Sequence, residues 1–182
     1  MDGSALLSVR DLEVQFKLPR RSLFSPAPIL KAVRGVSFDV AKGRTIGIVG
    51  ESGSGKTTLA LALMRLVPIS RGRVTLGSED ITGLSGKALR QARRRVQMIF
   101  QDPQSSLNPR LRVREIVREP LDIVGAGSSR ERNERVDELL SAVKLSPEMS
   151  SRFPHQLSGG QRQRIGIARA LSTRPEVIVC DE

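Results

Sequence analysis

Several residue types that characterise other classes of protein are scarce in this sequence. Its 182 residues include one cysteine, no tryptophan, no tyrosine and five phenylalanines. A single cysteine, Cys180, excludes an internal disulfide framework and is typical of a reducing compartment. Because few aromatic side chains are available to stack on bases, direct nucleic-acid binding is not expected.

Long apolar runs are also lacking. The densest stretch, LALALM at Leu59 to Met64, is far shorter than the roughly 18 residues that a membrane-spanning helix needs. The N-terminus, MDGSALLSVRD, has no charged start followed by an apolar block, so it does not predict a secretory signal. These absences predict a cytosolic protein.

Positive charge is abundant, since the sequence has 30 Lys and Arg but only 19 Asp and Glu, and the formal net charge is +11. Such a charge is compatible with a solvated basic surface, with a surface near an anionic membrane or with nucleic-acid binding. The basic residues are scattered, and RRR at Arg93 to Arg95 is the tightest cluster. This scatter favours the solvated surface.

Apolar periodicity predicts strands that alternate with helices. Alternation predicts strands at 6–16 and 36–40 and an edge strand or hairpin at 71–81, while the apolar runs at 45–50, 96–101 and 177–180 predict buried strands. Helices are predicted from Leu59 to Pro68 and along the apolar stripe of Val136, Leu139, Leu140 and Val143. This order predicts an α/β core with an N-terminal β region and a helical insert.

The chain stops at Asp181-Glu182, directly after a predicted core strand. Further strands and covering helices would be expected to complete such a core. The sequence therefore predicts a truncation.

The stretch GESGSGKTT, Gly50 to Thr58, matches the phosphate-binding pattern G-x-x-x-x-G-K-[ST] in full. Its glycines let backbone N–H groups point at phosphates. Lys56 can reach the β- and γ-phosphates, and the Thr57 hydroxyl can bind Mg²⁺. The following helix adds its positive N-terminal end. The pattern predicts nucleoside triphosphate binding in preference to a structural glycine turn.

Polar groups follow two of the predicted buried strands. Asp181 and Glu182 come after VIVC, where an aspartate can hold Mg²⁺ and a glutamate can take a proton from water. Gln101 ends VQMIFQ at the same predicted sheet edge and could contact Mg²⁺ or that water, although by residue type alone it is a loop glutamine. Cys180 is interpreted as a small core residue, not a reactive thiol.

A second glycine-containing motif, LSGGQ, lies at 157–161. Ser158 and Gln161 have the S-x-x-Q spacing of a helix capping box. A cap alone does not explain Gly159 and Gly160, which cost helix stability unless another group approaches the backbone closely. Since the first loop already accounts for one nucleotide, we expect the second motif to serve a nucleotide held by another copy.

LSGGQ, together with GESGSGKTT, Gln101 and VIVCDE in this order, resembles the ATP-binding subunit of ABC transporters. The resemblance covers nearly the whole chain. It implies an α/β fold with a P-loop NTPase (RecA-like) core, an N-terminal antiparallel β subdomain and an inserted α-helical subdomain, with the C-terminal part of the core missing. Residues 1–182 would form one incomplete nucleotide-binding domain, divided into 1–101, 102–154 and 155–182.

The resemblance also implies roles for individual residues. ATP would lie between the P-loop of one subunit and LSGGQ of the other, with Lys56, Gln101 and the base Glu182 as catalytic residues. Thr57, Gln101 and Asp181 would bind Mg²⁺. The nucleotide would be bound by Phe16, Gly50, Glu51, Ser52, Gly53, Ser54, Gly55, Lys56, Thr57, Thr58, Ser158, Gly159, Gly160 and Gln161.

A finer resemblance connects the chain to importers of di- and oligopeptides. It rests on GVSFDVAKGRTIGIVGESGSGKTT, FQDPQSSLNPRLRV and the EPL at Glu119 to Leu121. Nickel and glutathione importers share much of this pattern, so the solute stays open. In this group an aromatic residue near the end of the first strand stacks on adenine, and Phe16 is either that residue or a strand-core phenylalanine.

The chain departs from the family pattern after VIVCDE, because it ends before the D-loop and the switch histidine. Its one histidine, His155, precedes LSGGQ and is expected to be a surface residue. The expected function is an ATPase that powers an importer from the inner face of the cell membrane. Its partners would be permease subunits, a second ATP-binding subunit and, indirectly, a solute-binding protein. The alternatives are a hydrolytically inactive nucleotide-binding fragment and a soluble ABC ATPase outside transport.

Overall fold

The computed structural model describes residues 5–20, 26–101 and 106–181. The chain forms two compact units, Met1–Arg93 and Arg94–Glu182. The first unit contains an antiparallel sheet and two helices, and the second contains a helical bundle and a pair of parallel strands. No helix within the described ranges is both long and apolar enough to cross a membrane.

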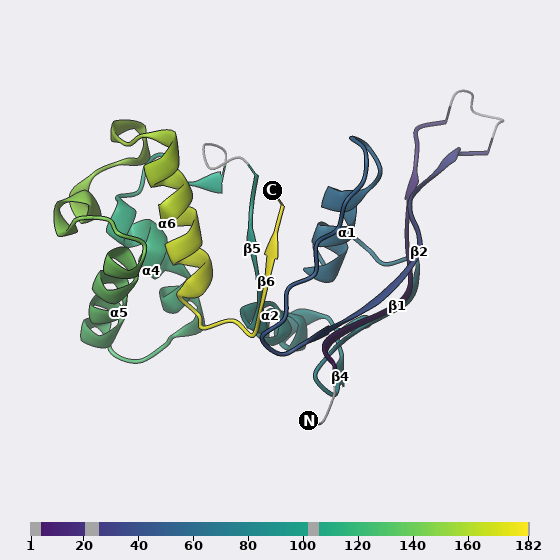
Figure 1. Ribbon diagram of the computed structural model, residues 1–182, viewed down its shortest axis with the longest axis horizontal. Coiled ribbons are helices and arrows are strands. Elements are labelled where there is room, and N and C mark those ends of the chain that lie inside the picture. The colour runs from purple at the N-terminus through teal and green to yellow at the C-terminus, as the bar shows by residue number, and fades with distance from the viewer. Residues whose placement is uncertain (1–4, 21–25, 102–105, 182) are drawn as a thin grey trace. The chain divides into compact units, whose positions relative to one another are not determined.

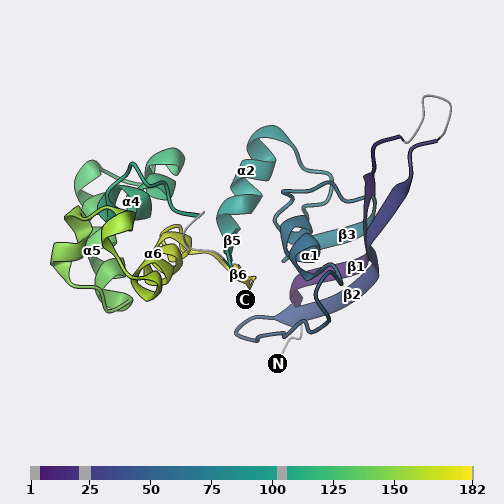
Figure 2. The ribbon, with the colours of Figure 1, turned by 90° about the horizontal axis from the view of Figure 1, so that it is seen from above.

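The first unit is built on a four-stranded sheet in the order β2-β1-β3-β4, and Figure 2 shows β1 between β2 and β3. Its strands are β1 (Ala5–Lys17), β2 (Ile29–Ala41), β3 (Arg71–Leu76) and β4 (Glu79–Asp80). The predicted strand at 6–16 and the predicted hairpin at 71–81 are confirmed, and β2 begins seven residues before the predicted 36–40. Two pairs of alternate residues of β1 supply the buried face, Leu7 and Val9 before an irregularity in the register and Leu12 and Val14 after it.

Helix α1 (Lys56–Leu63) packs against β1 and β2 through Leu59, Ala60, Ala62 and Leu63. It was predicted to run to Pro68, but it ends at Leu63. The reason is local, since Arg65 takes a left-handed conformation with φ 55°. The Arg93 guanidinium then donates to the carbonyls of Met64 and Arg65, which caps the exposed carbonyl end of the helix.

Helix α2 (Gly86–Arg95) has no counterpart among the sequence predictions. Its sequence, GKALRQARRR, contains few apolar residues, and Ala92 is the buried one. Because the helix is mostly basic, its small apolar face is easily overlooked in the sequence. The RRR cluster therefore lies in the last turn of a basic helix, directly before the next strand.

The segment TIGIVG at 45–50 was predicted to be a buried strand, and this prediction is wrong for the structure described. Residues 44–50 are not assigned to any strand. Their side chains are exposed, including Val49 at 96% and Ile48 at 45%. A strand requires a neighbour on its edge to pair its N–H and C=O groups, and the sheet of the first unit ends at β2 and β4.

The second unit contains the helices α4 (Val113–Val124), α5 (Ser129–Ala142) and α6 (Gly159–Leu171), which pack together in Figure 1. Two short 3₁₀ turns, η1 (Pro147–Ser151) and η2 (Pro154–Gln156), connect α5 to α6. The predicted stripe is confirmed, since Val136, Leu139 and Leu140 are buried and Val143 packs against them. Their cluster also includes Leu107, Val113, Ile116, Val117, Leu121, Leu145, Leu157, Ile165 and Ala168.

The second unit also contains the parallel pair β5 (Val96–Ile99) and β6 (Val177–Cys180). Both apolar runs are therefore strands, as predicted. Burial of β6 was predicted and is not observed, since Ile178 is 39% exposed. Cys180, interpreted from the sequence as a core residue, is exposed as well. A parallel strand becomes fully buried only when helices cover both of its faces, and within the second unit the side of β6 that carries Ile178 and Cys180 lacks such cover.

Candidate nucleotide-binding site

The loop from Gly50 to Gly55 in the first unit is folded back on itself. The Ser54 N–H donates to the Glu51 carbonyl at 3.2 Å, which closes a turn. Lys56, the first residue of α1, places its Nζ 2.8 Å from the Gly50 carbonyl oxygen and 2.9 Å from that of Glu51. The ammonium group therefore closes the loop at its entry, in the position predicted for a phosphate-binding lysine.

Gly55 is held where only glycine fits. Its φ is 98°, and a Cβ built on it would lie 2.3 Å from the Ala32 carbonyl oxygen. Ala32 is an extra residue on β2, because Val14 pairs with Val33 while the next residue, Gln15, pairs with Lys31. The loop is thus seated on an irregular point of the hairpin, and the missing side chain lets it approach.

The N-terminus of α1 is suited to an anion. No side chain caps it, and its first turn carries no acidic residue. The first N–H groups of a helix have no partner within the helix, and the aligned peptide dipoles favour negative charge there. Glu51, Ser52, Gly53, Ser54 and Thr57 are exposed around this end, and Thr58 is half-buried. Nucleotide phosphates therefore fit this loop.

Phe16 lies near the end of β1, opposite Leu30 of β2. It follows Leu12 and Val14 on the same face of the strand, but it is half-buried where they are buried. The position allows contact with a ligand and equally allows a packing role at the end of the core. Its stacking on adenine stays a prediction.

The LSGGQ motif opens helix α6 of the second unit, and the predicted capping box is confirmed. The Ser158 N–H donates to Oε1 of Gln161 at 2.9 Å, and the Gln161 N–H donates to Oγ of Ser158 at 3.3 Å. Arg162 supports the approach to the cap, since its Nε donates to the carbonyls of Pro154 and Leu157. The first turn of α6 is therefore held in place from both sides.

Gly159 and Gly160 face open space. A Cβ built on either glycine would meet no atom within 4 Å apart from its chain neighbours and its own helix, and both residues are exposed. Packing within the second unit therefore gives no reason for the two glycines. The feature agrees with the sequence argument that another molecule approaches this backbone.

His155 lies just before the motif and is exposed, as predicted. Its ring stacks on Phe153 with centroids 5.7 Å apart, and the Arg112 guanidinium lies 4.9 Å from the same phenylalanine ring. Cation–π and stacking contacts of this kind are weakly stabilising at exposed positions. The three side chains therefore add a small stabilisation to the turn that leads into LSGGQ.

Gln101 and Asp181 follow the carboxyl ends of β5 and β6. The strands are parallel, with Ile99 opposite Cys180, and the Asp181 N–H donates to the Ile99 carbonyl at 3.1 Å. The predicted common sheet edge is therefore present. Gln101 is exposed and Asp181 half-buried, and Glu182, the predicted base, lies outside the described residues.

Among the described residues, no group of three or more His, Cys, Asp or Glu side chains is placed to hold a metal ion. Mg²⁺ keeps several waters and takes phosphate oxygens with one or two protein ligands. The assignment of Thr57, Gln101 and Asp181 as its ligands stays a prediction.

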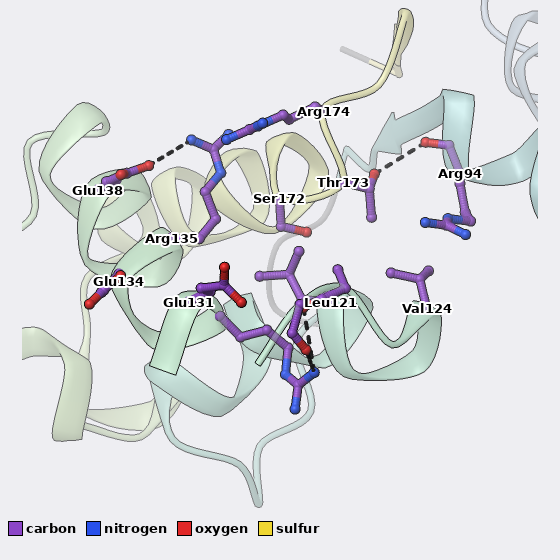
Figure 3. A pocket seen from close by; sticks show the side chains of 13 residues that line it. Arg94, Leu121, Val124, Glu131, Glu134, Arg135, Glu138, Ser172, Thr173 and Arg174 are labelled. Atoms are coloured by element: carbon purple, nitrogen blue, oxygen red, sulfur yellow. Dashed lines mark hydrogen bonds and ion pairs between the residues drawn. The ribbon is translucent and has the colours of Figure 1, made fainter. Parts of the chain in front are cut away.

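The second unit also has a pocket of about 430 Å³, shown in Figure 3. It lies between the end of α4, the first turns of α5 and the segment after α6, and none of the predicted nucleotide ligands lines it. Its charges are partly paired within the wall, since Arg135 contacts Glu138 at 3.0 Å. The pocket is therefore separate from the predicted phosphate-binding motifs.

A lysine-closed glycine loop that leads into an uncapped helix defines the class of P-loop nucleotide-binding domains. Comparison with known proteins gives the particular family. A family model described as ABC transporter matches residues 33–182, and the chain belongs to this family.

Two relatives are similar over nearly the whole chain. The chain is 49% identical over 180 residues to a probable peptide ABC transporter ATP-binding protein of Sinorhizobium fredii, covering 99% of this chain and 51% of the relative. It is 48% identical to an oligopeptide transport ATP-binding protein of Bacillus subtilis, covering 97% of this chain and 54% of the relative. The chain therefore spans about half the length of these relatives.

The fold is shared with solved ATP-binding cassettes. A dimeric cassette in a post-hydrolysis state bound to ADP and Pi has a TM-score of 0.83 and 30% identity, with 96% of this chain and 72% of that chain covered. A subunit of an ABC transporter complex from Clostridium perfringens has a TM-score of 0.77 and 26% identity, with 98% and 66% covered. The predicted fold class, a P-loop core with an antiparallel β subdomain and an inserted helical subdomain, is confirmed.

Proposed function

We propose that this chain belongs to the subunit that binds and hydrolyses ATP to power an importer of peptides or similar small solutes. The names of the two relatives support the transported class, because both refer to peptide or oligopeptide transport. The dimeric cassette supports the mode of action, because that protein pairs with a second copy and holds ADP and Pi. ATP-driven closure of two such domains would be the power stroke.

The open space at Gly159 and Gly160 is the observation that carries the proposal. The two residues open α6 where peptide dipoles favour an anion, and they leave the backbone bare. The γ-phosphate of a nucleotide held by the P-loop of a second subunit has the size and charge to fill such a place. Ser158 and Gln161 fix the turn that presents it.

The remaining roles follow from the same assignment. Gly50 to Thr58 would cradle the phosphates, with Lys56 stabilising the charge that develops on the transferred group. Mg²⁺, held by Thr57, Gln101 and Asp181, would neutralise charge on the phosphate oxygens. Glu182 would accept the proton of the attacking water.

Permease subunits are the proposed membrane partners, with a solute-binding protein acting through them. The helical region 102–154 would be the docking surface. Ile123 near the end of α4 supports this proposal, because it is 77% exposed and lies beside Val124, which lines the pocket of Figure 3. Exposed apolar side chains beside charged ones are typical of protein contacts. The subunit would then lie on the inner face of the membrane.

The test uses alanine at Gly160 in the complete subunit. Gly160→Ala should raise the free energy of unfolding by about 0.5–1 kcal/mol, since alanine is the better helix former and meets no atom. The same change should weaken the ATP-dependent dimer at least tenfold, because the methyl group occupies the place of the phosphate. Thermal unfolding and sedimentation with Mg²⁺–ATP measure the two effects.

Gly166→Ala is the matched control. Gly166 lies on the same helix, and a Cβ there also meets nothing within 4 Å. Its variant should gain stability and keep the dimer. If Gly160→Ala dimerised like the unchanged protein, the proposed role of LSGGQ would be wrong. If the unchanged subunit bound ATP but did not dimerise, the result would favour a nucleotide-binding protein that does not hydrolyse ATP.

A further inference from the structure

The last turn of α6, the helix that LSGGQ opens, is joined to Ser106. The Arg169 Nη1 donates to the Ser106 carbonyl oxygen at 2.6 Å, across 63 residues of sequence. Arg169 lies on α6, and Ser106 is five residues beyond Gln101. This charge-assisted hydrogen bond connects two segments that lie far apart in the sequence.

Arg169 is placed where an arginine is costly. The residue is half-buried, and burial lowers the pKa of its guanidinium while the charge of Glu119 acts in the opposite direction. Desolvating a guanidinium requires compensation by hydrogen bonds or opposite charge. The Ser106 carbonyl provides such a bond, so the contact is more than an incidental surface interaction.

An apolar contact reinforces the polar one. Leu107, the next residue after Ser106, is 2% exposed and belongs to the core cluster that contains Ile165 and Ala168 of α6. Ala168 and Arg169 are neighbours on the helix. Ser106 and Leu107 are therefore held on α6 by a hydrogen bond to the main chain and by burial of a side chain.

We propose that Arg169 is a positioning residue that makes Ser106 and Leu107 move together with helix α6. This inference rests on the proposed function, which assigns LSGGQ to the partner's nucleotide and Gln101 to Mg²⁺. The two ends of α6 then act on different groups, and the helix connects them. Ser158 to Gln161 meet the nucleotide at the first turn, and Arg169 holds Ser106 at the last.

The helix is well suited to transmit this motion. Its 13 residues span about 20 Å at the usual rise per residue. Ile165 and Ala168 are fully buried along its length, so it moves as a rigid element. Closure of a partner on LSGGQ would thus shift Ser106 directly.

The experiment compares Arg169→Met, Arg169→Lys and Arg164→Met in the complete ATP-binding subunit with its partner subunit. Methionine keeps most of the apolar stem and removes the hydrogen-bond donor, whereas lysine keeps a positively charged donor group. Arg164 is the matched control, because it is exposed on the same helix and also donates to a carbonyl, that of Lys144. Amide hydrogen exchange at Leu107 and Asn108 is followed with and without Mg²⁺–ATP, alongside kcat and KM for ATP.

We expect Arg169→Met to speed exchange at Leu107 and Asn108 about tenfold without nucleotide, as expected when a local contact of this strength is lost. Its kcat should fall about tenfold with KM for ATP within a factor of two, because nucleotide binding at the P-loop is untouched. Arg169→Lys should recover most of both quantities. Arg164→Met should change neither.

Unchanged exchange and unchanged kcat in Arg169→Met would overturn the inference. If that variant does not fold, the test is made on the unchanged protein. The inference then requires that ATP alters amide exchange in the LSGGQ segment and at Leu107 at the same ATP concentration. A response in LSGGQ alone would also overturn the inference. If the unchanged protein neither hydrolysed ATP nor changed its exchange in LSGGQ on adding ATP, the proposed function would be contradicted. The role of Arg169 would still be tested by comparing amide exchange of the unchanged protein and Arg169→Met without nucleotide.

Discussion

Glycine serves opposite purposes at two residues of this protein. Gly55 is crowded, because its Cβ position lies 2.3 Å from the Ala32 carbonyl, whereas Gly160 has open space around it. At Gly55 the missing side chain makes room for the protein's own backbone. At Gly160 we propose that it makes room for a group from outside the second unit. The same residue type would then carry a requirement of the fold at one place and a requirement of binding at the other.

Gly55→Ala should damage the phosphate loop. The new methyl group collides with a backbone carbonyl, and alanine at φ 98° is strained, so we expect a loss of about 2–4 kcal/mol of stability or displacement of the loop. Nucleotide affinity should fall at least tenfold. Binding of a fluorescent ATP analogue and thermal unfolding measure these effects.

Gly53→Ala separates the two causes. Its φ is 79°, but a Cβ there meets nothing within 4 Å. Its cost should be limited to the conformational strain of about 1 kcal/mol. Equal losses in both variants would show that contact with Ala32 is unimportant.

Sequence reasoning succeeded at residues whose role is local in the chain. The Ser158–Gln161 cap follows from a spacing of three residues and is present as predicted. Cys180 was misjudged because burial depends on which elements cover a strand, and spacing along the chain does not report that. The contact between Arg169 and Ser106 was missed for the same reason, since 63 residues separate the partners.

At the scale of elements, helix α5 shows how a terminus depends on protonation. The Ser128 N–H donates to Oε2 of Glu131 at 2.6 Å, and the Glu131 N–H donates to Oγ of Ser128 at 3.2 Å. The hydrogen bond from the Ser128 backbone N–H, followed by one from the Ser128 side chain, lowers the pKa of the Glu131 carboxyl group below its ordinary value. A carboxylate with a lowered pKa stabilises the folded state above its ordinary pKa, and this contribution is lost as the pH falls through the lowered value.

Glu131→Gln should therefore reduce the acid sensitivity of the second unit. The glutamine oxygen can still accept the Ser128 N–H, so the cap persists while the titrating group is removed. The slope of stability against pH below about pH 4.5 should become shallower. Urea unfolding at several pH values measures this slope.

Glu134→Gln is the matched control on the same helix. Its carboxylate pairs with Arg130 at 2.7 Å and takes no part in the cap. The slope should change less in this variant than in Glu131→Gln. The opposite ranking would show that the cap is not the source of the acid sensitivity.

Most strands and helices were predictable because apolar periodicity follows from one-sided burial. β1, the β3–β4 hairpin, β5, β6 and α5 all appear where periodicity or apolar runs placed them. Helix α2 and the segment at 45–50 were not predicted correctly. Helix α2 is so rich in arginine that its small apolar face was overlooked. The segment at 45–50 has the composition of a strand, but among the described residues of its unit it has no partner strand.

At the scale of the whole molecule, the family could be named from motifs, whereas the pairing of subunits is a matter for experiment. In the complete subunit, Glu182→Gln should bind ATP normally and lower steady-state hydrolysis by at least a hundredfold, because the proposed base is removed without loss of volume. ATP should then accumulate in a stable dimer. Gel filtration with Mg²⁺–ATP and phosphate release measure the two effects.

Asp181→Asn is the comparison for this prediction. Removing a proposed Mg²⁺ ligand should weaken the dependence of ATP binding on Mg²⁺, an effect that Glu182→Gln should lack. Steady-state hydrolysis that survived Glu182→Gln unchanged would mean that another group activates the water.

The open space around Gly159 and Gly160 also bears on genetics. A chain altered there is expected to fold, to reach normal abundance and to keep its phosphate loop, so it would compete with unaltered copies for the same partners. Every mixed assembly would then contain one faulty half. Alleles at these two positions should therefore behave as dominant negatives in a cell that carries both forms. Alleles at Gly55 that prevent folding should be recessive, because the altered product is cleared before it can assemble.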